Sequence, residues 1–179
     1  MPVIPVFDLD GTLLDSDAAL VSPFVALGVP PEQITFGHTL ADECERLGIE
    51  VADYLAHYDD ALALPFPGVE ELVAGLNRWA VCSNKHPLAG KAELARLGWQ
   101  PDVVMFADSF DGPKQLGPVL DAIGVRPDEV IFVGDTEHDR RCARDVGCHF
   151  ALAGWNPRVS AVLGDLVLSR PLDLLDHLG

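Results

Sequence analysis

Two aspartates near the start of the sequence, Asp8 and Asp10, are the first residues whose type and spacing could do chemistry. They end an apolar run and are followed directly by Gly11 and Thr12. One carboxylate of such a pair can attack a phosphorus atom and form an aspartyl-phosphate. The other can protonate the leaving oxygen and then deprotonate the attacking water. Because glycine allows a tight turn, we predict that Gly11 and Thr12 close over the substrate.

Further polar groups follow later apolar runs of the chain. Ser83 and Asn84 form one group, and Lys114 follows a loop rich in Asp and Gly. Asp135 precedes Asp139 by about one helical turn, which places both on one face of a helix. A hydroxyl, an amide and an ammonium, together with the N–H groups of the glycine loop, can bind the non-bridging oxygens of a phosphoryl group.

The apolar runs and the stretches between them predict an α/β fold. Buried strands are expected at residues 3–7, 79–82, 103–107, 130–133, 149–153 and 166–168. Helices are expected at about 87–97, 114–123 and 136–146, with a short amphipathic segment at the end. This alternation is typical of a Rossmann-like parallel sheet with helices on both faces. Ligands bind such sheets at the carboxyl ends of the strands, where all the polar groups named above would meet.

The predicted meeting of several carboxylates indicates a metal ion. If Asp8, Asp10 and Asp135 were left bare, like-charge repulsion would force one of them to hold a proton. A divalent cation removes this penalty. Carboxylate oxygens combined with phosphate and water are typical ligands of Mg²⁺, so we predict Mg²⁺ as the cofactor.

Residues 16–65 interrupt the alternation of strands and helices. They contain no clear strand and are expected to form three or four short helices. Nine acidic residues and one basic residue, Arg46, give this segment half of the net charge of −16. We predict a small helical cap at 16–65, inserted after the first strand and able to move relative to a core at 1–15 and 66–179.

The composition excludes several classes of function. Acidic residues outnumber basic ones 28 to 12, so nucleic acids and anionic membranes are not expected partners. No apolar run approaches the length of a membrane span, and the first residues do not resemble a signal peptide. The four cysteines have no metal-ligand spacing and are expected to be reduced. We expect a cytoplasmic protein that is a monomer or a homodimer.

Taken in order, these motifs resemble those of the haloacid dehalogenase superfamily. The run Asp-Leu-Asp-Gly-Thr-Leu-Leu-Asp-Ser at 8–16 is similar to the first motif, Ser83-Asn84 to the second, Lys114 to the third and Gly-Asp-Thr-Glu-His-Asp at 134–139 to the fourth. The segment at 16–65 is similar to the small cap of the subfamily that contains phosphoglycolate phosphatase and β-phosphoglucomutase. Phe-Pro-Gly-Val at 66–69 and Ser-Asn-Lys at 83–85 also resemble the phosphoglycolate phosphatase branch.

The resemblance implies a role for each carboxylate. Asp8 would be the nucleophile and Asp10 the general acid and base. Asp8, the backbone carbonyl of Asp10 and Asp135 would hold Mg²⁺, with Asp139 in support. The presence of Asp10 argues against true dehalogenation, because the dehalogenating branch lacks this second aspartate.

The resemblance also implies that Ser83 and Lys114 bind the phosphoryl oxygens. Two departures from the family pattern stand out: Gln115 follows Lys114 where many relatives have proline, and the cap is shorter than is usual for phosphoglycolate phosphatases. Lys85 could bind the substrate or a neighbouring carboxylate instead. His138 is expected to point to solvent.

The expected function is Mg²⁺-dependent hydrolysis of a small phosphorylated metabolite, phosphoglycolate-like or a sugar phosphate. Two alternatives stay open: a phosphomutase of the β-phosphoglucomutase type, and a non-hydrolytic phosphoacceptor or binding module. With one arginine and no lysine, the cap offers few partners to a second negative charge on the substrate. The roles of His38, Arg46 and His57 are not decided by the sequence.

Overall fold

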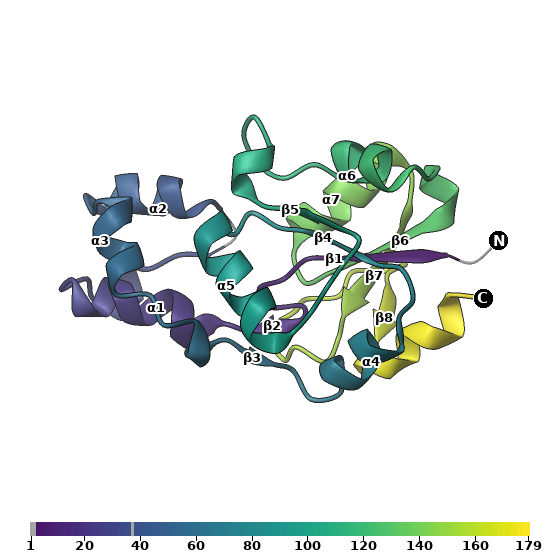
Figure 1. Ribbon diagram of the computed structural model, residues 1–179, viewed down its shortest axis with the longest axis horizontal. Coiled ribbons are helices and arrows are strands. Elements are labelled where there is room, and N and C mark those ends of the chain that lie inside the picture. Colours follow the sequence, from purple (N-terminus) through teal and green to yellow (C-terminus); the bar gives the residue numbers. More distant parts are fainter. Residues whose placement is uncertain (1–2, 37) are drawn as a thin grey trace.

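A parallel six-stranded sheet forms the centre of the protein, and the computed structural model describes residues 3–36 and 38–179 (Figure 1). The strand order is β5-β4-β1-β6-β7-β8, and every neighbouring pair is parallel. The strands are β1 (Ile4–Phe7), β4 (Ala80–Cys82), β5 (Val103–Met105), β6 (Val130–Gly134), β7 (His149–Ala153) and β8 (Leu166–Leu168). The central strands β1, β4 and β6 are fully buried, as continuous apolar runs predict.

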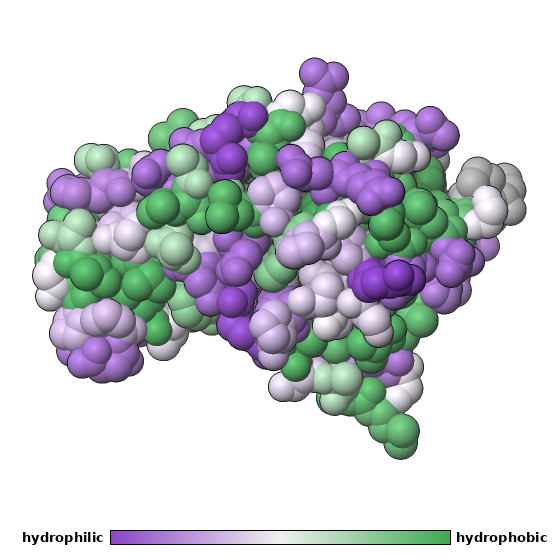
Figure 2. Space-filling model, turned by 90° about the horizontal axis from the view of Figure 1, so that it is seen from below, coloured by the Kyte–Doolittle hydropathy of each residue, from purple (hydrophilic) through white to green (hydrophobic). Residues whose placement is uncertain are grey.

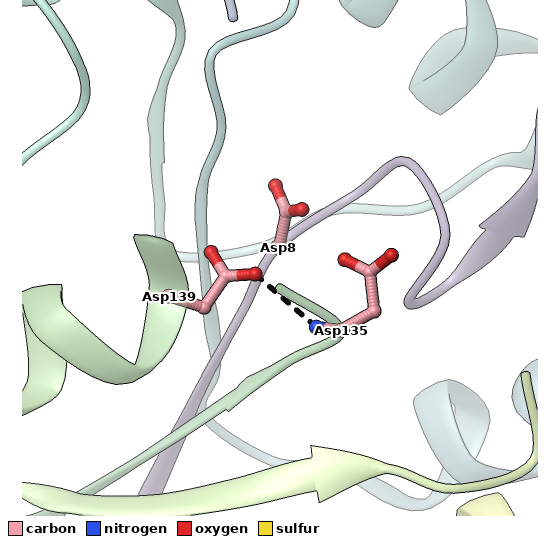
Figure 3. A group of neighbouring side chains, drawn as sticks. All are labelled: Asp8, Asp135 and Asp139. Carbon is pink, nitrogen blue, oxygen red and sulfur yellow. Dashed lines mark hydrogen bonds between the residues drawn. The ribbon is translucent and has the colours of Figure 1, made fainter. Parts of the chain in front are cut away.

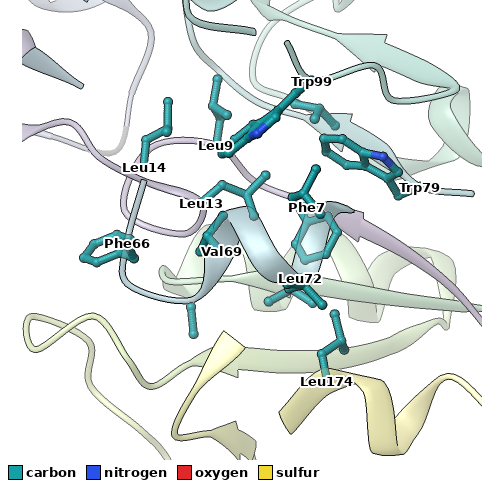
Figure 4. Close-up of a cluster of buried hydrophobic side chains, with 14 of the residues drawn as sticks. Phe7, Leu9, Leu13, Leu14, Phe66, Val69, Leu72, Trp79, Trp99 and Leu174 are labelled. Atoms are coloured by element: carbon teal, nitrogen blue, oxygen red, sulfur yellow. The ribbon is translucent and has the colours of Figure 1, made fainter. Parts of the chain in front are cut away.

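Helices cover both faces of this sheet, which confirms the predicted fold class. On one face lie α4 (Val69–Gly75), α5 (Pro87–Leu97) and a 3₁₀ helix (Pro171–His177). Their apolar side chains pack with Phe7 and Trp79 in the cluster that Figure 4 shows. On the other face, α6 (Leu116–Ile123) and α7 (Glu137–Val146) pack against the alternate strand residues. Two cores on opposite faces hold the strand ends in a fixed arrangement.

The local differences from the predicted elements have simple causes. The third predicted strand ends at Met105 because residues Ala107–Ser109 turn into a 3₁₀ helix. Helix α6 begins at Leu116 rather than 114, since Gln115 is extended and Lys114 points into the sheet edge. Helix α4 was not predicted; it is only seven residues long and too short for a clear periodic pattern.

The inserted segment forms its own helical layer at the end of the molecule opposite the two termini (Figure 1). It comprises α1 (Asp17–Ala26), α2 (Leu40–Leu47) and α3 (Val51–Ala56), with 3₁₀ turns at Pro31–Gln33 and Asp60–Leu62. These elements share a separate apolar cluster built on Phe24, Val29, Ile34, Cys44 and Tyr54. The helical content is as predicted, whereas the division of the chain into core and moving cap stays a prediction.

The two connections to the insert pair with each other, which the sequence analysis did not predict. Strand β2 (Leu14–Asp15) runs antiparallel to β3 (Leu64–Pro65). The two strands lie about fifty positions apart in the sequence, so no local pattern announces the pairing. This ladder brings entry and exit of the insert together beside the end of β1.

The surface is mixed in character. On the face seen in Figure 2, hydrophobic patches are separated by hydrophilic residues.

All four cysteines are unpaired, as expected. None of the helices in the described part of the chain has the length and apolar character needed to cross a membrane. Whether the protein is a monomer or a homodimer stays a prediction.

Glu43 on α2 organises the part of the insert that faces the sheet. Its carboxylate accepts hydrogen bonds from the Thr35 backbone N–H at 2.6 Å and from the Arg46 Nε at 2.8 Å, and lies 2.8 Å from His38 Nε2. Its side chain is only 4% exposed. Burial alone would raise the pKa of Glu43, but the hydrogen bonds from Arg46, Thr35 and His38 outweigh it and lower the pKa to about 2.

This network makes a prediction for the pH dependence of stability. Because the pKa of Glu43 falls on folding from 4.5 to about 2, its ionised form stabilises the folded state above pH 4.5, and this stability is lost as the pH falls towards 2. We expect Glu43→Gln to lower the free energy of unfolding by about 1–3 kcal/mol at pH 7. Thermal unfolding should show that the gap in Tm between the two proteins closes between about pH 4.5 and pH 2.

The matched control is Glu45→Gln, since Glu45 lies exposed on the same helix. Its Tm should follow that of the unmodified protein at every pH. A gap for Glu43→Gln that is constant over the whole range would contradict the assigned role of the carboxylate.

Candidate active site

Three aspartates meet at the carboxyl ends of the central strands (Figure 3). Asp8 follows β1, Asp135 follows β6, and Asp139 comes from the first turn of α7. One carboxylate oxygen from each lies within 4.8 Å of the other two. The sequence analysis placed these three side chains together, and the structure does bring them together.

Asp139 is fixed by contacts inside the protein. One of its oxygens accepts hydrogen bonds from the backbone N–H groups of Asp135 at 3.1 Å and Thr136 at 2.9 Å. The Thr136 hydroxyl donates to the same oxygen at 2.6 Å. Asp139 is fully buried, and its other oxygen faces the Lys114 ammonium at 2.6 Å. It therefore shapes the turn that carries Asp135.

Lys114 lies between two of these carboxylates. Its ammonium is 2.8 Å from an Asp8 oxygen and 2.6 Å from Asp139, and its side chain is almost fully buried. Burial lowers the pKa of a lysine, but here the two carboxylates outweigh burial and raise the pKa of Lys114 well above its ordinary value. The Asn84 side-chain oxygen accepts a hydrogen bond from the Lys114 backbone N–H at 2.7 Å. Asn84 thus holds the loop that carries the lysine, and a contact of Asn84 with substrate stays a prediction.

A second buried lysine, Lys85, binds Asp10. Its ammonium is 2.6 Å from an Asp10 oxygen and 2.9 Å from Glu93 on α5. Tyr58 of the insert donates a hydrogen bond to the same Glu93 oxygen. Of the two roles left open for Lys85, the structure shows the contact with a neighbouring carboxylate.

The sequence analysis missed Glu93 and Tyr58. The only available signal was the position of Glu93 on the buried face of α5, beside Ala89 and Leu94. A carboxylate in an apolar stripe needs a partner, and Lys85 supplies it. Burial raises the pKa of Glu93 to about 7, although Lys85 opposes this shift.

The turn after β1 is held by residues from the far end of the chain. Gly11 has a φ of 77°, and a Cβ atom there would lie 2.2 Å from an Asp135 oxygen. The buried Asn156 side chain donates to the Gly11 carbonyl at 2.7 Å, and Trp155 donates to the Thr12 carbonyl at 2.8 Å. Glycine is required here both by backbone conformation and by the close approach of Asp135.

Two other predicted residues have different surroundings. Ser83 is buried at the end of β4, lines the cavity described below and accepts a hydrogen bond from the Lys85 backbone N–H. His138 was expected to point to solvent, and this prediction is wrong. The side chain is half-buried, lines the same cavity and lies 3.5 Å from the Cys142 sulfur. Burial, followed by the charge of Lys114, lowers the pKa of His138.

The carboxylates fit a divalent cation. Burial and the neighbouring Asp8 and Asp139 raise the pKa of Asp135 to about 8, and burial raises that of Asp8 to about 6 despite Lys114. Asp135 has no lysine or arginine partner among the ion pairs of residues 3–36 and 38–179. A cation bound between Asp8 and Asp135 would remove this repulsion, and an all-oxygen donor set suits a hard ion.

A cavity of about 320 Å³ lies between these strand ends and the insert. Its floor is formed by charged side chains at the strand ends, those of Asp8, Asp10, Lys114 and Asp135. Side chains of α1, α2 and α3 form its roof. The cavity therefore lies between the sheet and the insert, directly above the converging charged groups.

One known protein family matches most of this chain. A family model described as haloacid dehalogenase-like hydrolase matches residues 5–153. The chain belongs to the haloacid dehalogenase-like hydrolase family. This confirms the resemblance drawn from the four motifs.

Individual proteins are similar to this chain over nearly its whole length. A protein named pyrophosphatase PpaX from Halalkalibacterium halodurans is 28% identical, over 97% of this chain and 95% of its own. A phosphoglycolate phosphatase from Aquifex aeolicus is also 28% identical, over 95% and 93%. The solved structure of a haloacid dehalogenase-like hydrolase from Streptococcus pneumoniae has a TM-score of 0.76 at 21% identity and covers 99% of both chains. The last comparison shows that the fold is shared.

The close approach of Gly11 to Asp135 makes a testable prediction. Gly11→Ala should destabilise the protein by more than the roughly 1–2 kcal/mol that a left-handed alanine costs, because the new methyl group displaces Asp135. Affinity for Mg²⁺ should fall as well. Urea unfolding and titration calorimetry with Mg²⁺ would measure both effects.

Gly28→Ala is the matched control, since Gly28 has a φ of 88° but no atom within 4 Å of an added Cβ. It should show the cost of the backbone conformation alone and bind Mg²⁺ normally. Equal losses in the two variants would contradict the proposed contact with Asp135.

Proposed function

We propose that this haloacid dehalogenase-like hydrolase is a Mg²⁺-dependent phosphatase that cleaves a small phosphomonoester through an aspartyl-phosphate on Asp8. One observation carries the proposal: the Asp8 carboxylate lies on the cavity floor with Lys114 beside it and Asp10 two residues away. Relatives named as phosphatases match nearly the whole chain, which supports the same class of reaction. The proposed partner is a small phosphorylated metabolite, and a cytoplasmic location stays a prediction.

The first half of the proposed reaction forms the intermediate. An Asp8 carboxylate oxygen attacks phosphorus, and the bond from phosphorus to the ester oxygen breaks. The carboxyl group of Asp10 gives its proton to that oxygen, so the substrate leaves as an alcohol. Lys114 offsets the negative charge on the phosphoryl oxygens, and Ser83, which also lines the cavity, donates a hydrogen bond to one of them in this proposal.

The second half returns Asp8 to its starting state. The Asp10 carboxylate takes a proton from a water molecule, the water oxygen bonds to phosphorus, and the bond from phosphorus to Asp8 breaks. Lys85 holds the Asp10 side chain in place through both steps. Mg²⁺, held by Asp8, Asp135 and the Asp10 carbonyl, would supply positive charge next to the phosphoryl oxygens.

The direct test is phosphate release from a panel of small phosphomonoesters. Release should require Mg²⁺ and should vanish in Asp8→Asn, because an amide cannot form the phosphoenzyme. Phosphate is measured by a colorimetric assay, and far-UV circular dichroism confirms that the variant is folded. Undiminished release by Asp8→Asn would overturn the proposal.

Two alternative outcomes would identify the other candidate functions. A stable phosphoprotein without release would favour a phosphoacceptor module. Transfer of the phosphoryl group back to a sugar, detected by NMR, would favour a phosphomutase.

A second prediction isolates Asp10. We expect Asp10→Asn to lower kcat by roughly 10²–10⁴-fold, the usual contribution of general acid–base catalysis. With a substrate whose leaving group needs no proton, such as 4-nitrophenyl phosphate, formation of the phosphoenzyme should be affected much less than its hydrolysis. Rapid-quench measurement of both steps distinguishes them. Near-normal turnover of an alkyl phosphate by this variant would refute the assignment.

A further inference from the structure

The roof of the active-site cavity is largely apolar. Leu20 of α1, Leu40 of α2 and the Tyr58 ring line it from the insert, and Phe36 lines it from the loop before α2. Phe36 is 54% exposed although it borders the cavity, and Leu20 and Leu40 are only partly buried. Their apolar surface is therefore available to a ligand that fills the space above the carboxylates.

The cations that line the cavity are already paired. Lys114 is bound to aspartates of the floor, and Lys85 is bound to Asp10 and Glu93. At the rim, the Arg158 guanidinium lies 3.3 Å from Asp15 and 3.1 Å from Asp17. Each positive side chain of the described lining thus has at least one carboxylate within ion-pair distance.

The basic residue of the insert does not reach the cavity. Arg46 is outside the cavity lining, where it bonds to Glu43 and to the Gln33 carbonyl. Among the histidines of the lining, burial lowers the pKa of His86, His38 is bonded to Glu43, and His138 lies 3.5 Å from the Cys142 sulfur. No unpaired cation therefore faces the upper part of the cavity within the described residues.

Negative groups, in contrast, exceed positive ones around the cavity. Five carboxylates line it, against two lysines and one arginine. A divalent cation and the dianionic phosphoryl group of a phosphomonoester would cancel each other, so the excess of negative charge around the cavity would remain. A second anionic group on the substrate would then face Asp17 and Glu43. The cations nearest to these carboxylates, Arg158 and Arg46, are already bound to them, so the desolvation cost of the second anion would not be repaid.

We propose that the substrate is a phosphomonoester whose leaving group carries no charge and presents an apolar surface to Leu20, Phe36 and Leu40. Esters whose leaving group carries a carboxylate or a further phosphate are poor substrates. A cavity of about 320 Å³ is at the lower end of small-molecule sites, so the leaving group is small. The inference rests on the proposed phosphatase function and names the class of substrate for it.

The test compares pairs of esters that differ in one property. 2-Phosphoglycolate and its neutral amide have almost the same shape and differ in charge, whereas benzyl phosphate and methyl phosphate differ in apolar surface. With Mg²⁺ present, kcat/KM should be at least about tenfold higher for the amide than for phosphoglycolate. It should also be at least about tenfold higher for benzyl than for methyl phosphate.

Each result has a distinct meaning. Equal or faster hydrolysis of phosphoglycolate than of its amide would overturn the inference while leaving the phosphatase function intact. Failure to release phosphate from any of the four esters would overturn the proposed function itself. A preference for methyl over benzyl phosphate would overturn the apolar contact.

A pair of variants locates the contact. Phe36→Ala should lower kcat/KM for benzyl phosphate by about tenfold and so reduce the benzyl-to-methyl ratio. Val25→Ala is the matched control, because Val25 is also an exposed apolar residue of the insert but lies outside the cavity lining. An unchanged ratio in Phe36→Ala, with circular dichroism showing a folded protein, would contradict the role given to Phe36.

Discussion

Two buried lysine ammonium groups hold four carboxylates together at the edge of the sheet. Lys114 joins Asp8 to Asp139, and Lys85 joins Asp10 to Glu93. Both lysine side chains are almost completely buried. Without them, the floor of the cavity would be a cluster of like charges taken out of water, which is among the costliest arrangements in a protein interior.

Such pairs are poor candidates for stabilising the fold. The desolvation of both partners roughly cancels their attraction, so a buried ion pair seldom stabilises more than an apolar pair of the same size. Stability comes instead from the clusters on the two faces of the sheet, which include Phe7 on one side and Phe132 on the other. The ion pairs serve to place Asp8 and Asp10 at fixed positions, which is what a reaction at phosphorus requires.

The sequence predicted the floor of the site, including Lys114, but only part of what supports it. Asp8 and Asp135 directly follow apolar runs, so strand ends that meet at one edge sufficed to bring them together. Contacts such as Tyr58 with Glu93 or Asn156 with Gly11 join positions 35 and 145 residues apart. No periodicity encodes pairings of this kind; they follow from how the insert and the last loop pack. Helix α4 was missed for the opposite reason, since it is too short to show a period.

The distribution of charge constrains how an anionic substrate could be recognised. The protein carries a formal charge of −16, which opposes the approach of any phosphate ester. At physiological ionic strength this repulsion is screened beyond roughly 8 Å, so the distant acidic faces of the insert hardly affect binding of the ester. Recognition must then come from groups in direct contact with the ester. Lys114 and a cation held by the aspartates can take up the charge of one phosphoryl group. The rest of the ligand meets an apolar roof. The charged floor of the cavity thus suits the phosphoryl group, and the roof suits an uncharged leaving group.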